Sequence, residues 1–135
     1  MAEAWMLERI AAHIGAGLPL AGLFDFTLET AEPARAVLRL NDTAHAHRPG
    51  GIVAGPVLFA AADVVAYALI LAHIGDPGAV TVDMAIHFLR AGRGLPLLAE
   101  ARRLYSAEIT IADPAAPDQP VVRAMATWAL SARAD

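Results

Sequence analysis

The sequence predicts an α+β domain in which a curved, mostly antiparallel sheet wraps around one long central helix. Three observations predict this arrangement. A long and almost wholly apolar segment, residues 56–73, has the length of a helix and is followed by helix-stopping residues. Segments rich in Val, Ile, Thr and Phe, typical of strands, lie on both sides of it. The chain has 135 residues, of which 57% are hydrophobic, so we expect residues 1–135 to form a single domain around one core.

The elements expected before the long helix are one helix and a hairpin. Residues 3–14 place apolar side chains at three- and four-residue spacing, which predicts an amphipathic helix that ends near the glycines of 15–17. Residues 24–29 alternate between apolar and polar side chains, and residues 36–40 resume after a turn signal. A loop rich in His, Pro and Gly, residues 41–51, then leads into the long helix.

The long helix is bounded by clear start and stop signals. Pro56 suits the first turn of a helix, and Gly75-Asp76-Pro77-Gly78 stops it. The strands expected after it are residues 80–89, 97–111 (possibly interrupted) and 121–130, with a proline-rich turn at 113–120.

A membrane span is the alternative explanation for so apolar a helix. Residues 55–74 approach the length of about 20 residues that crosses a bilayer. Asp63 and Tyr67 fall inside this segment, however, and the chain has no second candidate span. We therefore expect a helix buried on all sides, wrapped by the sheet or by a partner chain, and no membrane partner.

Composition argues against several classes of function. The net charge is −4 and no dense basic cluster occurs, which argues against a nucleic-acid partner. The absence of cysteine excludes disulfides, thiolate metal sites and a cysteine nucleophile. His45 and His47 lack a carboxylate at a suitable spacing, so no metal site is expected. No signal peptide is evident, and the expected location is the cytoplasm.

A carboxylate within the apolar helix calls for an explanation. An ionised Asp63 in such surroundings costs on the order of several kcal/mol unless it is hydrogen-bonded, protonated or put to use. The segment from Arg48 to Asp63 also opens the helix with glycines and Pro56. Chemistry is one use that accounts for this carboxylate.

The residues around this carboxylate resemble a known family pattern. The matching positions are Arg48, Ala54-Gly55-Pro56, Asp63, Val80-Thr81-Val82-Asp83-Met84 and Leu89-Arg90-Ala91. On these residues the chain resembles the hotdog-fold acyl-CoA thioesterases of the phenylacetate-degradation (PaaI) type over most of its length. The resemblance implies a hotdog fold and hydrolysis of an acyl-CoA to a carboxylic acid and free coenzyme A. It also implies a homodimer, possibly a dimer of dimers, and no cofactor, because coenzyme A is part of the substrate.

The resemblance assigns roles that the residue types support physically. The N–H of Gly55 at the helix start would hold the oxyanion of the thioester, and Asp63 would be the general base or the nucleophile. Thr81 would help to position the water or the carboxylate. The alternatives are an ordinary helix start, a structural Asp63 and a strand threonine chosen for its β propensity.

Five further residues are candidates for contact with the substrate: Arg48, Ala54, Pro56, Phe59 and Arg90. Arg48 stands where many relatives have Asn, and Ala54 where they have His. The candidates for the phosphates of coenzyme A are Arg48, Arg90, Arg93, Arg102 and Arg103. Asp83 alternates onto the same strand face as Thr81 and is expected to be structural.

The spacing of Gly55 and Asp63 predicts a site shared between subunits. Eight residues separate them, which is about 12 Å along a helix. One helix cannot present both groups to a single carbonyl. We therefore expect Gly55 of one subunit to act with Asp63 of another, which makes dimerisation a requirement of the mechanism.

Two other functions on the same fold remain as alternatives. A non-catalytic hotdog module that binds acyl thioesters would explain the absence of the family's His and Asn. A hydratase is weaker, because hydration generally needs an Asp and His pair and the helix start carries no His. Aromatic, medium-chain and short-chain acyl groups are all compatible with the sequence.

Overall fold

The computed structural model describes residues 5–103 and 106–130. Its helices are α1 (Leu7–Gly17), α2 (Pro19–Leu23), the short 3-10 helix η1 (Ala44–Ala46) and α3 (Gly55–His73). Its strands are β1 (Phe26–Glu32), β2 (Arg35–Leu40), β3 (His47–Arg48), β4 (Ile52–Val53), β5 (Val80–Phe88), β6 (Leu97–Arg103), β7 (Ala107–Ala112) and β8 (Val122–Ala129).

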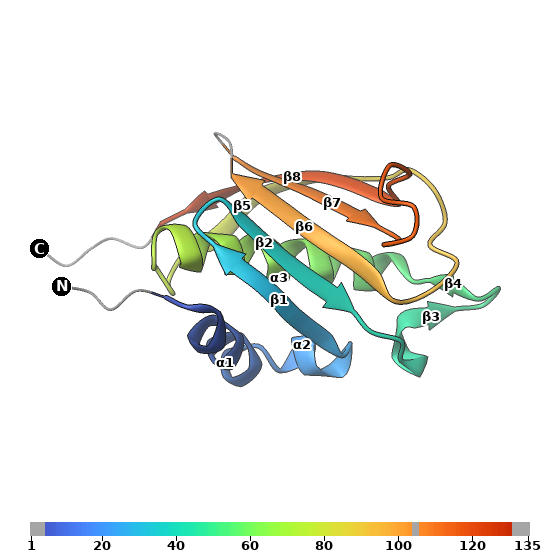
Figure 1. The fold of residues 1–135 in the computed structure, drawn as a ribbon, viewed down its shortest axis with the longest axis horizontal. Helices are drawn as coiled ribbons and strands as arrows, with labels where there is room; N and C mark the ends of the chain where they lie inside the picture. The colour runs from blue at the N-terminus through green and yellow to red at the C-terminus, as the bar shows by residue number, and fades with distance from the viewer. Residues whose placement is uncertain (1–4, 104–105, 131–135) are drawn as a thin grey trace, which may run out of the picture.

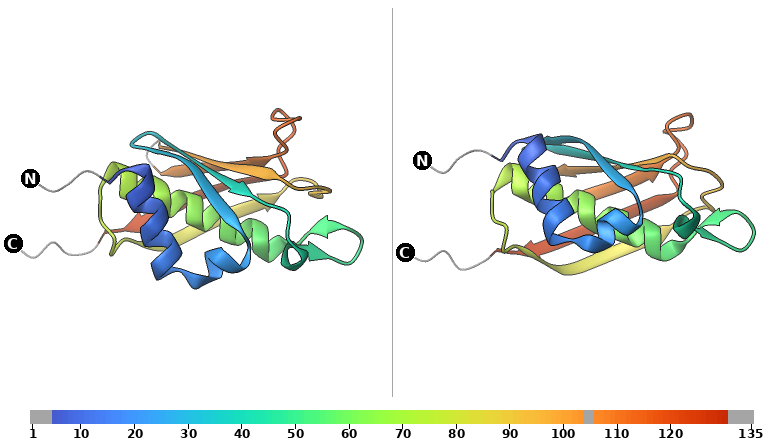
Figure 2. Two further views of the ribbon diagram at one scale, coloured as in Figure 1. Left: turned by 60° about the horizontal axis from the view of Figure 1, so that its bottom comes forward. Right: turned by 90° about the horizontal axis from the view of Figure 1, so that it is seen from below.

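Six of these strands form one antiparallel sheet that curves around α3. The strand order is β1-β2-β6-β7-β8-β5, so β1 and β5 are its two edges. Figure 1 shows the sheet lying across α3, and in Figure 2 strands lie on two sides of this helix. The strands β3 and β4 form a separate small hairpin beside the start of α3. The α+β prediction of a sheet wrapped around a long helix is confirmed.

The N-terminal part differs from the prediction in its helix boundaries. α1 ends at Gly17, within the 15–17 region predicted to stop it, but it begins at Leu7, later than the predicted residue 3. Pro19 then begins the short helix α2, which the sequence pattern did not predict. α1 packs against β1 and α3 (Figure 2). The hairpin of β1 and β2 follows as predicted.

The chain after α3 forms four strands of the main sheet. The predicted segment 97–111 is divided into β6 and β7, which pair as an antiparallel hairpin. Residues 41–51, expected as a loop, also contain η1 and β3. Both glycines of the β3–β4 turn have positive φ, 96° at Gly50 and 69° at Gly51, so they serve the turn.

α3 is the core helix, but it is not buried on all sides as expected. One side packs on the sheet through residues such as Val57, Leu58, Ala61, Val65 and Leu69. The opposite side leaves a stripe at helical spacing partly or fully exposed: Pro56, Phe59, Asp63, Tyr67 and Ile70. Hence a single chain covers only one side of its central helix. α3 is long enough to span a membrane, and its mean hydropathy is 2.0. However, 56% of this apolar segment is buried within the protein, as in a core helix.

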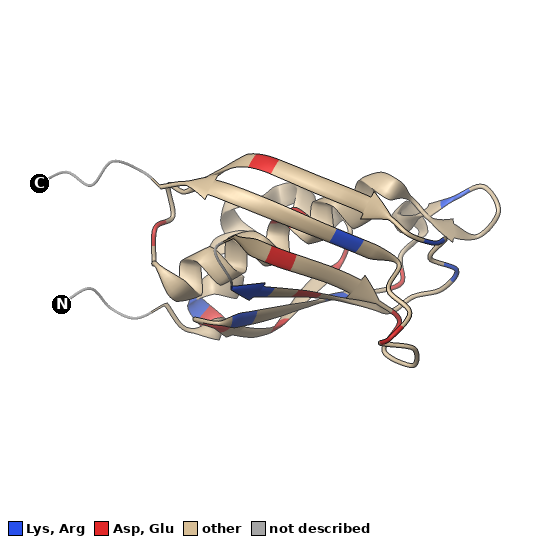
Figure 3. Ribbon diagram, turned by 90° about the horizontal axis from the view of Figure 1, so that it is seen from above, with Lys and Arg blue, Asp and Glu red and all other residues tan. Residues whose placement is uncertain are grey.

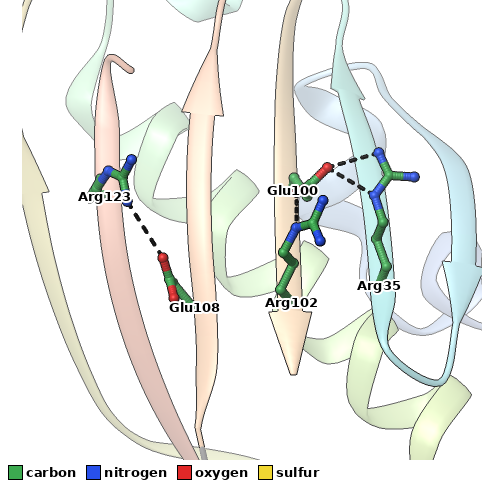
Figure 4. Close-up of polar contacts among 5 residues, drawn as sticks. All are labelled: Arg35, Glu100, Arg102, Glu108 and Arg123. Atoms are coloured by element: carbon green, nitrogen blue, oxygen red, sulfur yellow. Dashed lines mark hydrogen bonds and ion pairs between the residues drawn. The ribbon is translucent and has the colours of Figure 1, made fainter. Parts of the chain in front are cut away.

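The outer face of the sheet carries acidic and basic residues on neighbouring strands. Glu100 on β6 accepts hydrogen bonds from Arg35 on β2 at 2.9 Å and from Arg102 at 2.5 Å (Figure 4). Arg123 on β8 lies 3.5 Å from Glu108 on β7. Figure 3 shows the two signs of charge interspersed over the strands rather than gathered on one element.

Candidate active site

The start of α3 is held in place by backbone hydrogen bonds from the two residues before it. The N–H of Val53 bonds to the carbonyl of Gly92, and that of Ala54 bonds to the carbonyl of Ala46, both at 2.8 Å. Ala54 is the N-cap residue of α3, with an extended backbone, and its methyl side chain makes no hydrogen bond to the first N–H groups of the helix. Its carbonyl accepts from the N–H groups of Val57 and Leu58.

Gly55 contributes an N–H group that is free to bind a ligand. Among the described residues this N–H has no acceptor, and the next residue, Pro56, has no N–H to offer. Gly55 lies close to the ring of Phe88, which a Cβ at this position would meet at 3.9 Å. The helix start therefore presents one donor with partial positive charge, suited to an oxyanion.

Asp63 is held by a hydroxyl from the adjacent edge strand. The Oγ1 of Thr81 on β5 donates a hydrogen bond of 2.6 Å to Oδ1 of Asp63. Within the described part of the chain, Oδ2 of Asp63 has no hydrogen-bond partner. The contact fixes one oxygen of the carboxylate and leaves the other for a water or a substrate.

Asp83 does not share a strand face with Thr81, contrary to the sequence prediction. Thr81 pairs with Trp128 of β8 and Asp83 with the next residue, Thr127, so a bulge at Val82 shifts the register. The bulge turns Asp83 to the outer face of the sheet. Asp83 is therefore separated from the carboxylate of Asp63 by the sheet itself.

A groove along the exposed stripe of α3 contains half of the predicted site residues. We call it the Gly55 groove. It has a volume of about 610 Å³ and is lined by Leu20, Gly55, Pro56, Phe59, Ala60, Asp63 and Phe88. Its walls are apolar apart from the helix-start N–H and the carboxylate of Asp63. Four of the predicted site residues thus line one surface.

A second hollow lies on the other side of Asp63, and we call it the Tyr67 pocket. It has a volume of about 420 Å³. Its lining includes Asp63, Thr81, Tyr67, His13 and Trp128, together with apolar residues from α1 and the start of β5. Asp63 therefore lies where the Gly55 groove meets the Tyr67 pocket, so a group bound at this carboxylate could extend in both directions.

Tyr67 is fixed at the far wall of this pocket. Its hydroxyl donates to the carbonyl of Pro77 at 2.9 Å and lies 3.0 Å from Nε2 of His13. Because the hydroxyl has one hydrogen, His13 must donate from Nε2. The ring stacks on Trp128 with centroids 5.6 Å apart. Burial raises the pKa of Tyr67, and the negative charge of Asp76 raises it further, so the hydroxyl stays protonated at neutral pH.

The two arginines predicted to contact substrate lie outside both hollows. Arg48 is exposed on β3, and Arg90 donates to the carbonyl of Pro120 at 3.2 Å. Arg102 is engaged by Glu100 on the outer face of the sheet. All five arginines considered for phosphate binding are exposed, and Arg93 follows Gly92, whose carbonyl accepts the N–H of Val53 just before α3.

The lining residues that were not singled out from the sequence include Phe88, Trp128 and His13. They come from β5, β8 and α1, so only the fold brings them together. Tyr67 could be associated with Asp63 from the sequence, because it follows by four residues and shares the helix face.

No metal centre is formed by the described residues. Nε2 of His47 lies 2.8 Å from Oδ1 of Asp42, a pairing that the sequence pattern did not indicate. No group of three or more metal-binding side chains occurs within residues 5–103 and 106–130.

Comparisons with known proteins agree with this arrangement. Residues 50–106, from the β3–β4 turn past the end of β6, match the family model of the thioesterase superfamily. The Escherichia coli PaaI protein of the phenylacetic acid degradation operon superposes with a TM-score of 0.75 and 19% identity, over 95% of this chain and 97% of that one. The chain described here is a hotdog-fold protein similar to the PaaI-like thioesterases.

Other hotdog proteins superpose comparably. Zebrafish thioesterase superfamily member 2 does so with a TM-score of 0.77 and 19% identity, over 93% of this chain and 99% of that one. The Streptococcus mutans protein smu.793, bound to acetyl-CoA, has a TM-score of 0.71 and 18% identity, over 82% of this chain and 92% of that one. A search of curated proteins finds no match to the chain.

Proposed function

We propose that the protein is a thioester hydrolase that cleaves an acyl-CoA to a carboxylic acid and free coenzyme A. The observation that carries the proposal is the site on α3, where a free helix-start N–H and a carboxylate held by Thr81 line one apolar groove. The match of residues 50–106 to the thioesterase superfamily covers all three of these residues. The acetyl-CoA bound to the S. mutans neighbour supports coenzyme A as the carrier. Coenzyme A enters as part of the substrate, and the proposal requires no cofactor.

The hydrolytic step uses the two ends of the site. Oδ2 of Asp63 takes a proton from a water, and the water oxygen attacks the thioester carbonyl carbon. The carbonyl oxygen becomes an oxyanion that accepts a hydrogen bond from the N–H of Gly55. Collapse of this intermediate breaks the C–S bond, and the proton held by Asp63 passes to the departing thiolate. Direct attack by Oδ2 would instead break the C–S bond, release the coenzyme A thiolate and form an anhydride, which water then opens to the carboxylic acid and free Asp63.

The active site in this proposal forms between two copies of the chain. Gly55 and Asp63 lie about 12 Å apart along α3, so one carbonyl cannot reach both groups of the same helix. The exposed stripe of α3 and the free edge of β5 are the surfaces that a second copy would cover. In such a homodimer, Gly55 of one subunit approaches Asp63 of the other.

A non-catalytic module that binds acyl thioesters is the second candidate. Its supporting observation is the N-cap, where the side chain of Ala54 offers no polar group beside Gly55. In that case the Gly55 groove would bind the thioester without cleaving it.

Turnover by the Asp63→Asn variant separates the two functions. Asn keeps the size of the side chain and can still accept from Thr81, but it cannot take a proton. For the hydrolase we expect kcat to fall by on the order of 10²–10⁴. The assay is release of free coenzyme A from aryl-acyl and straight-chain acyl-CoAs, with circular dichroism as the control for folding. Equal turnover by the variant and the wild type would exclude Asp63 as the catalytic group, and saturable binding without turnover in both would favour the binding module.

A further inference from the structure

Trp128 is the residue at which two hollows beside α3 meet. One is the Tyr67 pocket. The other lies at the C-terminal end of α3, has a volume of about 560 Å³ and is lined by residues that include Leu69, Ile70, His73, Ile74 and Leu130. We call it the His73 hollow. Among the described lining residues, only Trp128 belongs to both, so its indole forms the wall between the two hollows.

The wall consists of two stacked rings that come from different elements. The indole of Trp128 projects from β8, where Trp128 pairs with Thr81 of β5, and the ring of Tyr67 projects from α3. The rings are nearly parallel, at 9°, and their centroids are 5.6 Å apart. Tyr67 is itself held by its hydrogen bonds with Pro77 and His13. The stack therefore fixes the indole across the end of the Tyr67 pocket.

The indole N–H of Trp128 is buried and has no hydrogen-bond partner within the described residues. A buried tryptophan usually finds a partner for this group, and leaving the group unpaired costs stability. Among the described residues, packing against Tyr67 rather than a polar contact of the indole holds the ring in place. The contribution of Trp128 at this position is therefore its shape, which a ring without an N–H can partly replace.

The Tyr67 pocket suits a hydrocarbon chain. The polar groups of Tyr67 and His13 are bonded to each other. Much of the remaining lining is apolar and includes Ile14, Leu18, Val64, Ala79 and Val80. Coenzyme A is the larger half of the proposed substrate and needs an open path, which the Gly55 groove provides along the exposed stripe of α3. With the thioester carbonyl at Asp63, the acyl group therefore extends into the Tyr67 pocket.

We propose that Trp128 limits the acyl group of the substrate to a short chain, because its indole blocks the way from Asp63 into the His73 hollow. Asp63 and Tyr67 are four residues apart on α3, which is about 6 Å along a helix. An extended chain advances by less than its bond length of about 1.5 Å for each carbon, so an acyl group of about six carbons, carbonyl included, reaches the wall. This inference rests on the proposed function and specifies its substrate class.

Removal of the indole should lengthen the acyl group that the enzyme accepts, because Trp128→Ala joins the two hollows into one space. For coenzyme A release by the wild type, we expect kcat/KM to be more than about tenfold higher with hexanoyl-CoA than with dodecanoyl-CoA. Trp128→Ala should abolish or reverse this preference. Trp128→Phe keeps a ring against Tyr67 and should retain the preference. Trp5→Ala removes the other tryptophan, which lines neither hollow, and serves as the matched control.

Binding measurements test the same limit without turnover and on the unaltered protein. The probes are S-(2-oxoalkyl)-CoA thioethers, which keep a carbonyl but have no thioester bond to cleave. By calorimetry, we expect the Kd of the wild type to fall by roughly fourfold for each added carbon up to about six carbons and then to level off. In Trp128→Leu, which keeps an apolar side chain in the core, the Kd should continue to fall with longer chains. A wild-type Kd that falls steadily up to the dodecanoyl length would overturn the proposal, whether or not any variant folds.

The two measurements separate this inference from the proposed function. A Kd that levels off at the expected length, with no coenzyme A release from any acyl-CoA, refutes the hydrolase and supports the wall. Turnover with equal kcat/KM for hexanoyl-CoA and dodecanoyl-CoA refutes the wall and supports the hydrolase. An unchanged preference in a folded Trp128→Ala, or the same change in Trp5→Ala, contradicts the role of Trp128. If no thioether binds and no acyl-CoA is cleaved, both proposals are refuted.

Discussion

The contact between Thr81 and Asp63 determines what the carboxylate can do. A hydrogen bond of 2.6 Å to Oδ1 orients the group and restricts its rotation. Oδ2 remains open to the place where the Gly55 groove and the Tyr67 pocket meet. In the proposed mechanism Thr81 is therefore a positioning residue, because it acts on the substrate only through Asp63.

Substitution of Thr81 should lower the rate without removing the reacting group. Thr81→Val keeps the shape and the β-branched backbone preference but deletes the donor to Asp63. A hydrogen bond to a charged group contributes about 1.5–3 kcal/mol, so we expect kcat to fall by roughly ten- to a hundredfold with little change in KM. Thr81→Ser retains the hydroxyl and should recover most of the rate. Equal rates for the Val and Ser variants in coenzyme A release would contradict the positioning role.

Individual site residues differ in how far the sequence could predict them. Gly55 and Asp63 stand out in the sequence because a glycine-proline start and a carboxylate in an apolar helix are locally unusual. The face of Asp83 could not be predicted, because the bulge at Val82 depends on how β5 pairs with β8. Phe88, Trp128 and His13 carry no local signal and reach the site only through tertiary packing.

At the scale of elements, ion pairs link neighbouring strands across the outer face of the sheet. Glu100 on β6 joins Arg35 of β2 to Arg102 of its own strand (Figure 4). Burial alone would raise the pKa of Glu100. The hydrogen bonds and positive charges of Arg102 and Arg35 outweigh burial and lower it below the ordinary value of 4.5. The folded protein thus favours the ionised carboxylate.

The stabilising effect of Glu100 should disappear in acid. A carboxyl group whose pKa is lowered by folding stabilises the protein above its unfolded pKa, and this contribution is lost as the pH falls through the folded pKa. We expect Glu100→Gln to unfold at a lower temperature than the wild type above about pH 5.5, with the difference shrinking as the pH falls below the unfolded value. Thermal unfolding of both proteins at a series of pH values above and below pH 4.5 measures this difference in Tm. A difference in Tm that is constant with pH would show that the ion pairs are not its cause.

The helices and strands were predictable where Gly or Pro residues mark their ends. Pro56 and Gly75 bound α3, and the structure has that helix within one residue of the prediction. No Gly or Pro separates Arg103 from Ala107, so the boundary between β6 and β7 was open from sequence. The β3–β4 hairpin escaped prediction because each of its strands has only two residues, too few for an alternating pattern.

At the scale of the whole molecule, one chain leaves one side of its central helix and the β5 edge of the sheet uncovered. Phe59 on α3 is 44% exposed, and the apolar residues of β5 lie at the adjacent edge. The sequence predicts that α3 is enclosed by the sheet or by a partner chain; within the described residues the sheet covers one side of it, and Pro56 and Phe59 on the other side stay exposed. In the proposed homodimer, the surface left open is the surface on which the substrate is cleaved.

The central claim, that Gly55 and Asp63 of different subunits form one site, leads to a complementation experiment. Asp63→Asn removes the base. Gly55→Pro removes the N–H and adds a ring, which the extended Ala54 before it accepts and which meets Phe88 only at ordinary contact distance at its Cβ. Gly55→Ala keeps the N–H and makes an ordinary contact with Phe88, so it is the matched control and should remain active. We expect each of the first two variants to be nearly inactive as a homodimer.

Coenzyme A release after the two inactive variants are unfolded together and refolded as a mixture is the most direct measurement. A shared site predicts that each heterodimer has one intact site and one doubly defective site. An equal mixture, in which about half of the dimers are hybrids, should then regain about a quarter of the wild-type activity. If both residues served the same subunit's site, every site in the mixture would carry a defect. A mixture as inactive as its separate components, with hybrids shown to have formed, would contradict the account.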